Sequence, residues 1–412
     1  MASSSLTERL AHHLARPVPG DMGARARLHL LDWLGCVAGA LEAPVAAAVR
    51  AMEGGALARA AWLGNVLEMD DVHRMSILHP GPVIWPVALG GDGAPGMDAR
   101  LAAAVRGYEA VIAIGATFDG YHYARWHNTA TAGVFGATAT AASLAGAGAE
   151  TTVSALGLAG SVAGGLWRMR HEPVMAKHWH VAHAVDTGLA AARAARAGIT
   201  GPRFVLEGEQ GLYAAMTGTP RPMRLEDGWR MDEVSFKPWG ACRHAHPAID
   251  AALALRENGA ALDGSILVET YRDALTFCDR PDPASVAEAK FSLHHAVAVV
   301  AERGEPVLAD FEPAAIAALA PARARIKVCE ATEFSERFPA HYGARVTAGG
   351  RAVERIDTLG DPERPLGRGG VIAKARALMD WGGVGQDADA AIAACLSGDD
   401  PRAIVALLET WL

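Results

Sequence analysis

The feature that most constrains the fold of this chain is a set of helix-length segments built mainly from small residues. One of them, starting at Asn128, reads NTATAGVFGATATAASLAG, and another of the same kind starts at Thr152. The distance between two packed helices depends on the side chains at their contact, so small residues favour close approach. Half of the chain (51%) is hydrophobic but only 6% is aromatic, which predicts tightly packed helices rather than a core filled by large rings.

The first 235 residues show only helical patterns. Ser5 and Glu8 form the spacing of a capping box, which predicts a helix that stops before Pro17. Leucines recur at helical spacing between Met22 and Ala40, and Asp98 is expected to cap a later helix. Further helices are predicted over 44–52, 98–117, 128–146, 152–168 and 177–198.

The pattern changes after about residue 235. Alternating apolar residues over 264–271 and 324–329 predict strands, and 344–347 with 351–356 predict a hairpin around Gly349-Gly350. Helices are expected from Pro247, over 290–303, and again over 370–381 and 387–412. The expected fold is therefore mainly α: a large helical domain of residues 1–235 plus 365–412, with a smaller, lid-like α/β domain of residues 236–364 inserted.

Charge and cysteine content narrow the choice of partners and compartment. The formal charge is −8 and no basic block occurs, which argues against nucleic acid or an anionic membrane as partner. The five cysteines are scattered without any CxxC, which argues against a disulfide framework or a zinc ribbon. No signal peptide is visible, and the most apolar window, 152–167, is too short and Gly-rich for a comfortable membrane span. A cytoplasmic protein is expected.

The segment LEMDDVHRMSILHPGPVIWP, residues 67–86, combines acids with histidines. Pro80-Gly81-Pro82 predicts irregular backbone, and ordered polar loops on a rigid scaffold often carry chemistry. A solvated acidic turn is the alternative, but the apolar end of the segment predicts burial there. The candidate residues of this loop are Glu68, Asp70, Asp71, His73 and His79.

Many of the sixteen histidines fall at predicted loop–helix junctions. The free N–H groups and positive dipole end of a helix N-terminus suit a carboxylate ligand, and Lys177 with Arg168 or Arg170 offers fixed positive charge. A single histidine is more often a hydrogen-bonded core or surface residue than a catalytic one. The junction histidines are His79, His127, His178, His180, His244, His246, His294 and His295.

Several blocks in this chain resemble the 2-methylcitrate dehydratase (MmgE/PrpD) family, which also includes cis-aconitate decarboxylase and iminodisuccinate epimerase. The blocks are LLDWLGCVAG, EMDDVH with HPG, RWHNTATAGVFGATATAA, AKHWHVAHA and KPWGACRHAHPAIDAALAL. The resemblance implies a helical domain with an α/β insertion, a homodimer, and a reaction without metal or organic cofactor. These expectations agree with the domain pattern read from the residues.

The resemblance also implies site residues. Glu68 stands where decarboxylase-type members have an acidic residue, although those have Asp and a loop one residue shorter. His79 matches the histidine of the family's loop, and His127 matches the histidine of RWHNT. Lys177 and His180 match the family's Lys-x-x-His pair. His246 matches the histidine of the family's H-x-x-I-D motif.

His295 is a departure, because the family generally has tyrosine there. Histidine titrates near pH 6.5 and can serve as base or acid, whereas tyrosine stays a neutral donor at pH 7. The substitution therefore points to a subgroup distinct from the named dehydratase and decarboxylase. Cys242 lies beside the predicted site, either as a nucleophile or as a small packing residue.

Reactions of the family share a carbanion-like centre next to a carboxylate, which needs a base near neutrality and positive groups at the developing charge. The role of the base suits four of the histidines, namely His79, His127, His246 and His295. Lys177 and an arginine suit the role of positive groups at the developing charge. Asp70 and Asp71 are expected to orient His73 or His79 rather than react, and all three residues Asp70, Asp71 and His73 are expected to lie at the substrate-binding site. We expect a lyase acting on a small di- or tricarboxylate, most simply a dehydratase, with epimerisation or decarboxylation as alternatives.

Two functions other than a lyase or an isomerase remain as alternatives. The pairs His178/His180 and His244/His246 have ligand types and spacing suited to a metal-dependent hydrolase, although neither pair follows a predicted strand. The second alternative is a non-catalytic relative of the family that binds a carboxylate.

Overall fold

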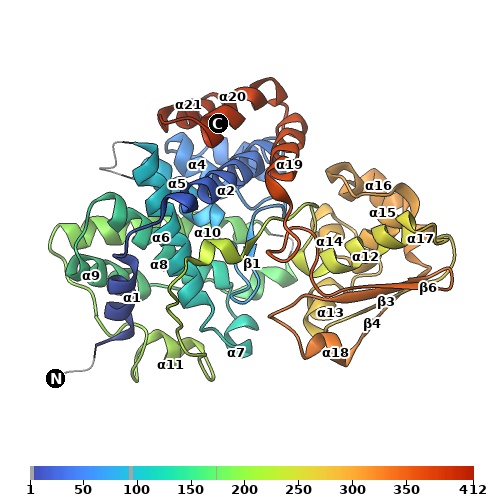
Figure 1. Cartoon of the computed structure of the whole chain (residues 1–412), viewed down its shortest axis with the longest axis horizontal. Coiled ribbons are helices and arrows are strands. Elements are labelled where there is room, and N and C mark those ends of the chain that lie inside the picture. Colours follow the sequence, from blue (N-terminus) through green and yellow to red (C-terminus); the bar gives the residue numbers. More distant parts are fainter. Residues whose placement is uncertain (1–3, 92–95, 173) are drawn as a thin grey trace. The chain divides into compact units, whose positions relative to one another are not determined.

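The computed structural model describes residues 4–91, 96–172 and 174–412. It is mostly helical, which confirms the expected mainly α class (Figure 1). The chain divides into two compact units: unit 1 is Met1–Val66, Asp70–Val234 and Val371–Leu412, and unit 2 is Leu67–Met69 and Ser235–Gly370. Three residues of the acid-rich loop, Leu67–Met69, thus pack within unit 2.

Unit 1 is built from helices, and those predicted from the capping box and from leucine spacing are confirmed. Ser5 caps the first helix through the expected reciprocal pair with Glu8. The elements are α1 (Leu6–Leu14), α2 (Gly20–Gly39), α3 (Pro44–Arg50), α4 (Ala56–Leu63), β1 (Val72–His73), α5 (Gly81–Gly90), α6 (Met97–Gly115), α7 (Gly120–Tyr123), α8 (Asn128–Leu144), α9 (Ala149–Gly160), η1 (Trp167–His171), α10 (Ala176–Arg196), α11 (Leu212–Met216), η2 (Arg230–Glu233), α20 (Ala388–Leu396) and α21 (Arg402–Trp411). The helix α19 (Gly367–Trp381) begins at the unit boundary.

The small-residue helix α8 lies at the centre of unit 1 and packs against α6 and α10. A Cβ atom on Gly136 of α8 would lie 2.8 Å from Val111 Cβ and 3.1 Å from Gly107 O of α6. A Cβ on Gly188 of α10 would overlap Ala137 of α8. Close approach at these positions is therefore possible only for glycine, as the composition of the segment predicted.

Three local predictions were wrong. Pro80-Gly81-Pro82 does not prolong the loop but begins α5, because proline is tolerated in the first turn, where the backbone N–H has no helical partner. Asp98 lies in the first turn of α6, whose N-cap is Gly96. The helix expected over 152–168 ends at Gly160; Gly165, with φ +106°, then turns the chain toward η1.

Unit 2 contains a four-stranded sheet covered by helices (Figure 1). Its strand order is β4-β3-β5-β6, with β3 parallel to β4 and antiparallel to β5. The elements are η3 (Arg243–Ala245), α12 (His246–Glu257), β3 (Ile266–Thr270), α13 (Arg272–Cys278), α14 (Val286–Lys290), α15 (Leu293–Arg303), η4 (Leu308–Phe311), α16 (Pro313–Ala318), α17 (Ala320–Arg323), β4 (Ile326–Glu330), α18 (Thr332–Ser335), β5 (Ala344–Ala348) and β6 (Arg351–Arg355); β2 (Val234–Ser235) lies at the boundary.

The predicted hairpin of unit 2 is confirmed. Val346 of β5 pairs with Val353 of β6, and the turn between them is Gly349-Gly350, both with positive φ. Two consecutive positive φ angles are the requirement of a tight type I′ turn, which explains the Gly-Gly pair. Helix α12 packs on β5 and β6, and α15 packs on β4 and α12, so the sheet supports the helix that carries His246.

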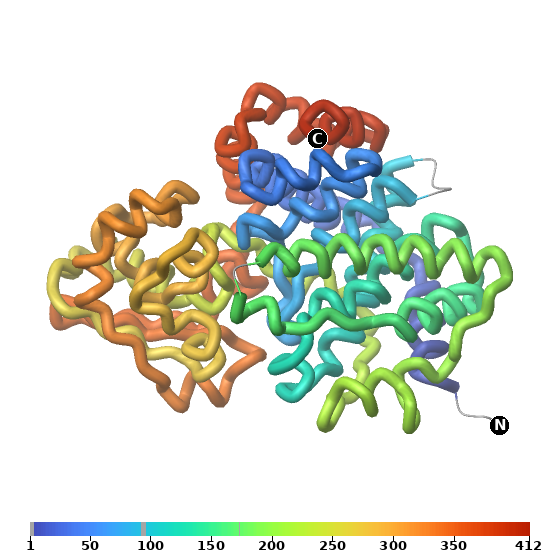
Figure 2. The backbone as a smooth tube through the Cα atoms, turned by 180° about the vertical axis from the view of Figure 1, so that it is seen from behind, coloured from blue at the N-terminus to red at the C-terminus, as the bar shows by residue number. Residues whose placement is uncertain are grey.

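Within unit 1, the tail of the chain returns to its beginning. Helix α20, near the red end of the chain, packs against the blue α2 (Figure 2). Over the described residues, no single helix combines the length and hydropathy of a membrane span, although α2 and α3 together, with a 93° bend, meet the length and composition test.

Candidate functional site

His79 is held in one tautomer by the residues that precede it. Its Nδ1 lies 2.9 Å from the carbonyl oxygen of Asp71 and 3.0 Å from Asp70 Oδ2. A carbonyl oxygen only accepts, so Nδ1 carries the proton and Nε2 is the basic nitrogen. The His79 side chain is 16% exposed, whereas that of Asp70 is 1% exposed. A buried carboxylate beside Nδ1 stabilises the imidazolium that forms when Nε2 takes a proton.

The buried carboxylate of Asp71 fixes the backbone that positions His79. Its Oδ2 accepts hydrogen bonds from His29 Nδ1 (2.8 Å) and the Tyr108 hydroxyl (2.6 Å), and its Oδ1 accepts one from Gly81 N (2.8 Å). These bonds fix the start of α5 and the backbone that holds His79. Burial lowers the pKa of His29 to about 4, so His29 donates as a neutral imidazole.

His73 is engaged at both ring nitrogens. The backbone N–H of Ser76 donates to Nδ1 (3.2 Å), so Nε2–H donates to Glu233 Oε2 at 2.9 Å. Burial lowers the pKa of His73 below its ordinary value. These bonds fix the loop next to β1, and the substrate-binding role predicted for His73 stays a prediction.

His127 and His180 lie close to His79 within unit 1. His127 is buried at the start of α8, and its Nδ1 lies 3.4 Å from Nδ1 of His180, so one imidazole donates to the other. Burial, the charge of Lys177 and the neighbouring His180 and His79 hold the pKa of His127 well below its ordinary value. Unit 1 therefore brings together five predicted site residues: Asp70, His79, His127, Lys177 and His180.

The two predicted arginines lie on η1. The Arg168 side chain is 75% exposed and pairs with Glu172 at 2.8 Å. Arg170 lies over the Trp167 ring, 5.4 Å from its centroid, and that ring is 4.7 Å from the imidazole of His127. Arg170 is thus connected to the histidine cluster through one aromatic ring, and the substrate-binding role of both arginines stays a prediction.

In unit 2, Glu68 meets a buried lysine. Lys237 Nζ lies 3.4 Å from Glu68 Oε2, and the Lys237 side chain is fully buried. Glu68 has a φ of +57°, which is uncommon outside glycine and occurs where the surroundings enforce it. Lys290 contributes by donating from Nζ to Leu67 O at 2.9 Å. Two buried lysines therefore hold the segment that contains Glu68.

Sequence reasoning missed Lys237 and Lys290. Lys237 lies in the block KPWGACRHAH singled out above, and Lys290 lies five residues before His295. A signal was present, because lysine is almost never fully buried unless it is paired, and Lys237 stands between Phe236 and the apolar Pro238-Trp239. That environment predicts a buried charge with a carboxylate partner.

His246 and Asp250 of α12 are integrated into the core of unit 2. The Nε2–H of His246 donates to Ala241 O (3.1 Å), and its Nδ1 accepts from Arg243 (3.2 Å). Asp250 accepts from Arg355 and Arg364 at 2.9 and 2.5 Å. Neither nitrogen of His246 can take a proton in this state without losing a hydrogen bond, and its catalytic role stays a prediction.

His295 has a similar environment. Its Nε2–H donates to Asp310 O at 2.8 Å, and its Nδ1 lies 3.4 Å from Arg323 Nη1. Burial lowers its pKa, so the neutral ring bridges α15 to η4 and α17. A bridging role explains why histidine suits this position, and the predicted catalytic role is untested.

Cys242 is buried at the N-cap of η3, and its backbone N–H donates to Lys290 O at 2.8 Å. Glu68, Lys237 and the thiol of Cys278 lie within reach of its own thiol. The structure therefore places Cys242 with Glu68 and Lys237 rather than in a purely apolar setting.

The histidine pairs proposed as metal ligands have other partners. His178 Nδ1 lies 3.0 Å from Asn65 Oδ1, and His244 Nδ1 lies 2.6 Å from the Tyr271 hydroxyl. Among the described residues, a set with metal-ligand spacing is His341, Asp357 and Glu363, whose ligand atoms lie within 4.8 Å of one another. That set contains neither predicted pair.

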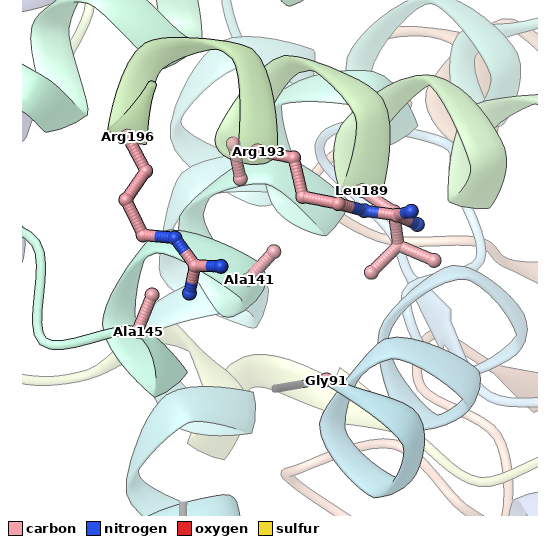
Figure 3. A pocket seen from close by; sticks show the side chains of 7 residues that line it. Gly91, Ala141, Ala145, Leu189, Arg193 and Arg196 are labelled. Carbon is pink, nitrogen blue, oxygen red and sulfur yellow. The ribbon is translucent and has the colours of Figure 1, made fainter. Parts of the chain in front are cut away.

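Two cavities of unit 1 contain no predicted site residue. One, of about 20 Å³, lies between α8 and α10, where the Arg196 side chain extends toward Ala141 and Ala145 and that of Arg193 toward Leu189 (Figure 3). The other, of about 270 Å³, is lined by residues of α1 and α8 and by Arg106, which donates to Leu14 O and Ser143 Oγ. Neither is lined by a histidine or a carboxylate, so neither offers the acid–base groups of the histidine cluster.

Comparison with known proteins finds two family domains in this chain. Residues 51–224 match the MmgE/PrpD N-terminal domain, and residues 239–397 match the MmgE/PrpD C-terminal domain. The chain belongs to the MmgE/PrpD family. It is also 28% identical over 183 residues to human cis-aconitate decarboxylase, a match that covers 42% of this chain and 37% of the relative's length.

The gap between the two MmgE/PrpD domains, residues 225–238, brackets the point at which the chain passes from unit 1 to unit 2. The N-terminal MmgE/PrpD domain contains His79, His127, Lys177 and His180, and the C-terminal domain contains His246 and His295. MmgE/PrpD proteins are typically lyases or isomerases, which supports a lyase-type function at the level of the family.

Burial of two histidines in unit 1 predicts how stability depends on pH. Burial lowers the pKa of His29 and of His122 to about 4. The unfolded chain binds protons at these sites near pH 6.5 and the folded chain only near pH 4, so stability is full above pH 6.5 and is lost as the pH falls. Each site should cost roughly 3 kcal/mol by pH 4.

Asp32 partly offsets the loss of stability at low pH that His29 and His122 cause. Burial raises its pKa to about 6, so the folded state gains stability from its protonation below pH 6. We expect a net decrease in the urea midpoint from pH 7 to 4.5, and a shallower decrease for His122→Gln. An equal slope in the two proteins would contradict the assignment to His122.

Proposed function

We propose that this protein is a lyase that removes a proton from the carbon next to a carboxylate of a small di- or tricarboxylate, and that the reaction is a dehydration. The observation that carries the proposal is the orientation of His79, whose Nδ1 is committed to Asp71 O and Asp70 while Nε2 stays the basic nitrogen. A base at a helix start suits a substrate with carboxylates.

In the proposed reaction, His79 Nε2 takes the proton and negative charge develops on the substrate carboxylate. Lys177, within electrostatic reach of His127, supplies positive charge at the cluster, and preorganised charge of this kind lowers the barrier where charge develops. The imidazolium of His79, stabilised by Asp70, then returns the proton to the departing hydroxyl, which leaves as water. One residue therefore serves as base and acid.

The neutral pair His127 and His180 is proposed to donate a hydrogen bond to the substrate, because desolvation disfavours the charged form of both the buried His127 and the half-buried His180. In unit 2, we propose Glu68 with Lys237 as the group suited to acid–base work, whereas His246 and His295 already use both ring nitrogens.

Epimerisation is the second candidate. An epimerase needs two acid–base groups on opposite faces of one carbon, and unit 1 offers two imidazoles, His79 and His127, in one cluster. Decarboxylation is supported by the similarity to a cis-aconitate decarboxylase and would need a donor that reprotonates the carbon.

Proton NMR in D₂O tests these alternatives with 2-methylcitrate, citrate, cis-aconitate, tartrate, malate, aspartate and iminodisuccinate. For a hydro-lyase, we expect loss of the signal of the proton next to the carboxylate together with a new vinyl signal. Exchange with only a diastereomer appearing would instead indicate an epimerase, and product formation with release of CO₂ a decarboxylase. Absence of any exchange across the panel would refute the proposed substrate class.

A further inference from the structure

The structure brings two buried thiols of unit 2 together. Cys242 stands at the start of η3 and Cys278 ends α13, and these two elements pack against each other. The contact is held by His244, whose Nδ1 lies 2.6 Å from the Tyr271 hydroxyl and whose ring stacks on Phe277 at 5.1 Å. The packing of these elements brings the two thiols within electrostatic reach of each other. The scattered cysteines of the sequence thus include one close pair.

The two thiols are chemically unequal. Burial and the charge of Glu68 raise the pKa of Cys242, whereas the Cys278 thiol, the His244 backbone and Lys237 lower it, so that this pKa lies below the ordinary value. Burial and the neighbouring Cys242 hold the pKa of Cys278 well above the ordinary value. The thiolate is the reactive form of cysteine. Cys242 is 7% exposed, whereas Cys278 is 0% exposed, and Lys237 lies within electrostatic reach of the Cys242 thiol. We therefore assign Cys242 as the attacking sulfur and Cys278 as the sulfur that resolves the sulfenic acid.

We propose that Cys242 and Cys278 form an oxidation site that hydrogen peroxide converts into a disulfide. The Cys242 thiolate attacks one peroxide oxygen, the O–O bond breaks, and protonation of the departing hydroxide gives water and a sulfenic acid at Cys242. Cys278 sulfur then attacks the sulfenic sulfur and loses its proton, and the hydroxyl leaves as a second water. Two thiols are oxidised by two electrons in total, and the peroxide is reduced to two waters.

The disulfide would change the surroundings of Glu68. It removes a thiol near the Glu68–Lys237 pair and fixes the end of α13 to η3 beside it. If Glu68 acts as the proposed function states, oxidation should inactivate the enzyme and a dithiol reductant should restore it. This consequence rests on the proposed function, whereas formation of the disulfide does not.

The test is peptide mapping by mass spectrometry without reduction, after the purified full-length protein has been treated with hydrogen peroxide and its remaining thiols alkylated. We expect one intramolecular cross-linked peptide pair containing Cys242 and Cys278, lighter by two hydrogens and cleaved by dithiothreitol. Cys395→Ser, which changes a buried cysteine of unit 1, should give the same cross-link. Cys278→Ser and Cys278→Ala should instead accumulate sulfinic acid at Cys242.

Other results overturn the proposal. These are sulfinic acid at Cys242 in the unsubstituted protein without the cross-link, two unmodified thiols after treatment, or a disulfide confined to the exposed Cys329. Activity is followed on the same samples. A cross-link that forms while turnover stays unchanged would support the oxidation site and contradict the proposed role of Glu68, so the two failures are distinguishable.

Discussion

Replacement of His79 by glutamine should lower kcat/KM by roughly a hundred- to ten-thousand-fold, the range that one general acid–base residue contributes. Glutamine keeps polarity and approximate size but has no nitrogen that takes a proton at neutral pH. The folded structure should persist, because the bond from His79 Nδ1 to Asp71 O is one hydrogen bond at a half-buried position. Steady-state kinetics on the substrate identified by NMR, together with the thermal midpoint, measures both quantities.

The matched control for this variant is His12→Gln, which changes an exposed histidine of α1 in the same unit. Its kcat/KM should equal that of the unsubstituted protein. Solvent exchange of the substrate proton should also disappear in the His79 variant, since no base remains to take it. If His79→Gln retained full exchange, the assignment of His79 as the base would be wrong, whatever the turnover.

Replacement of Asp71 by alanine should lower the free energy of unfolding by roughly 3–5 kcal/mol, because three buried donors lose their acceptor at once. These donors are His29 Nδ1, the Tyr108 hydroxyl and Gly81 N, all within 2.8 Å of the carboxylate. Urea denaturation followed by circular dichroism measures the change. The variant should also lose activity, since the backbone that orients His79 is no longer fixed.

Tyr108→Phe separates the contribution of one donor from that of the carboxylate. It leaves the bonds from His29 and Gly81 in place but also removes the acceptor of the Trp85 Nε1–H, so the loss should be about 2 kcal/mol. Asp21→Ala, at an exposed position of α2, should remain within about 0.5 kcal/mol of the unsubstituted protein. Equal losses for Asp71→Ala and Tyr108→Phe would show that the carboxylate is not the centre of this network.

Local structure was largely predictable because its causes lie within a few residues. The capping box of Ser5 and Glu8, the Gly349-Gly350 turn and the small residues of α8 each specify their geometry through neighbours in the sequence. Predictions failed where one local rule competed with another. Pro80-Gly81-Pro82 is typical of a loop. Proline is also compatible with the first turn of a helix, however, and this segment begins α5.

The candidate site was predictable in composition but not in arrangement. The acid and histidine loop, Lys177 and His180 were all selected from the sequence, whereas Lys237 and Lys290 were not. The sequence also treated residues 68–79 as one functional segment. In the structure Glu68 belongs to unit 2, and Asp70 through His79 belong to unit 1.

The sequence by itself determined the helical class, the α/β character of the later part and the kind of chemistry available, because periodicity and residue type are local properties. Only the tertiary structure decided which nitrogen of each histidine is basic and which groups share a neighbourhood. His79 differs from His246 and His295 through its hydrogen-bond partners and its partial exposure, and Cys242 meets Cys278 only through the packing of α13 on η3. Such contacts join residues distant in the chain, and their geometry depends on how whole elements pack.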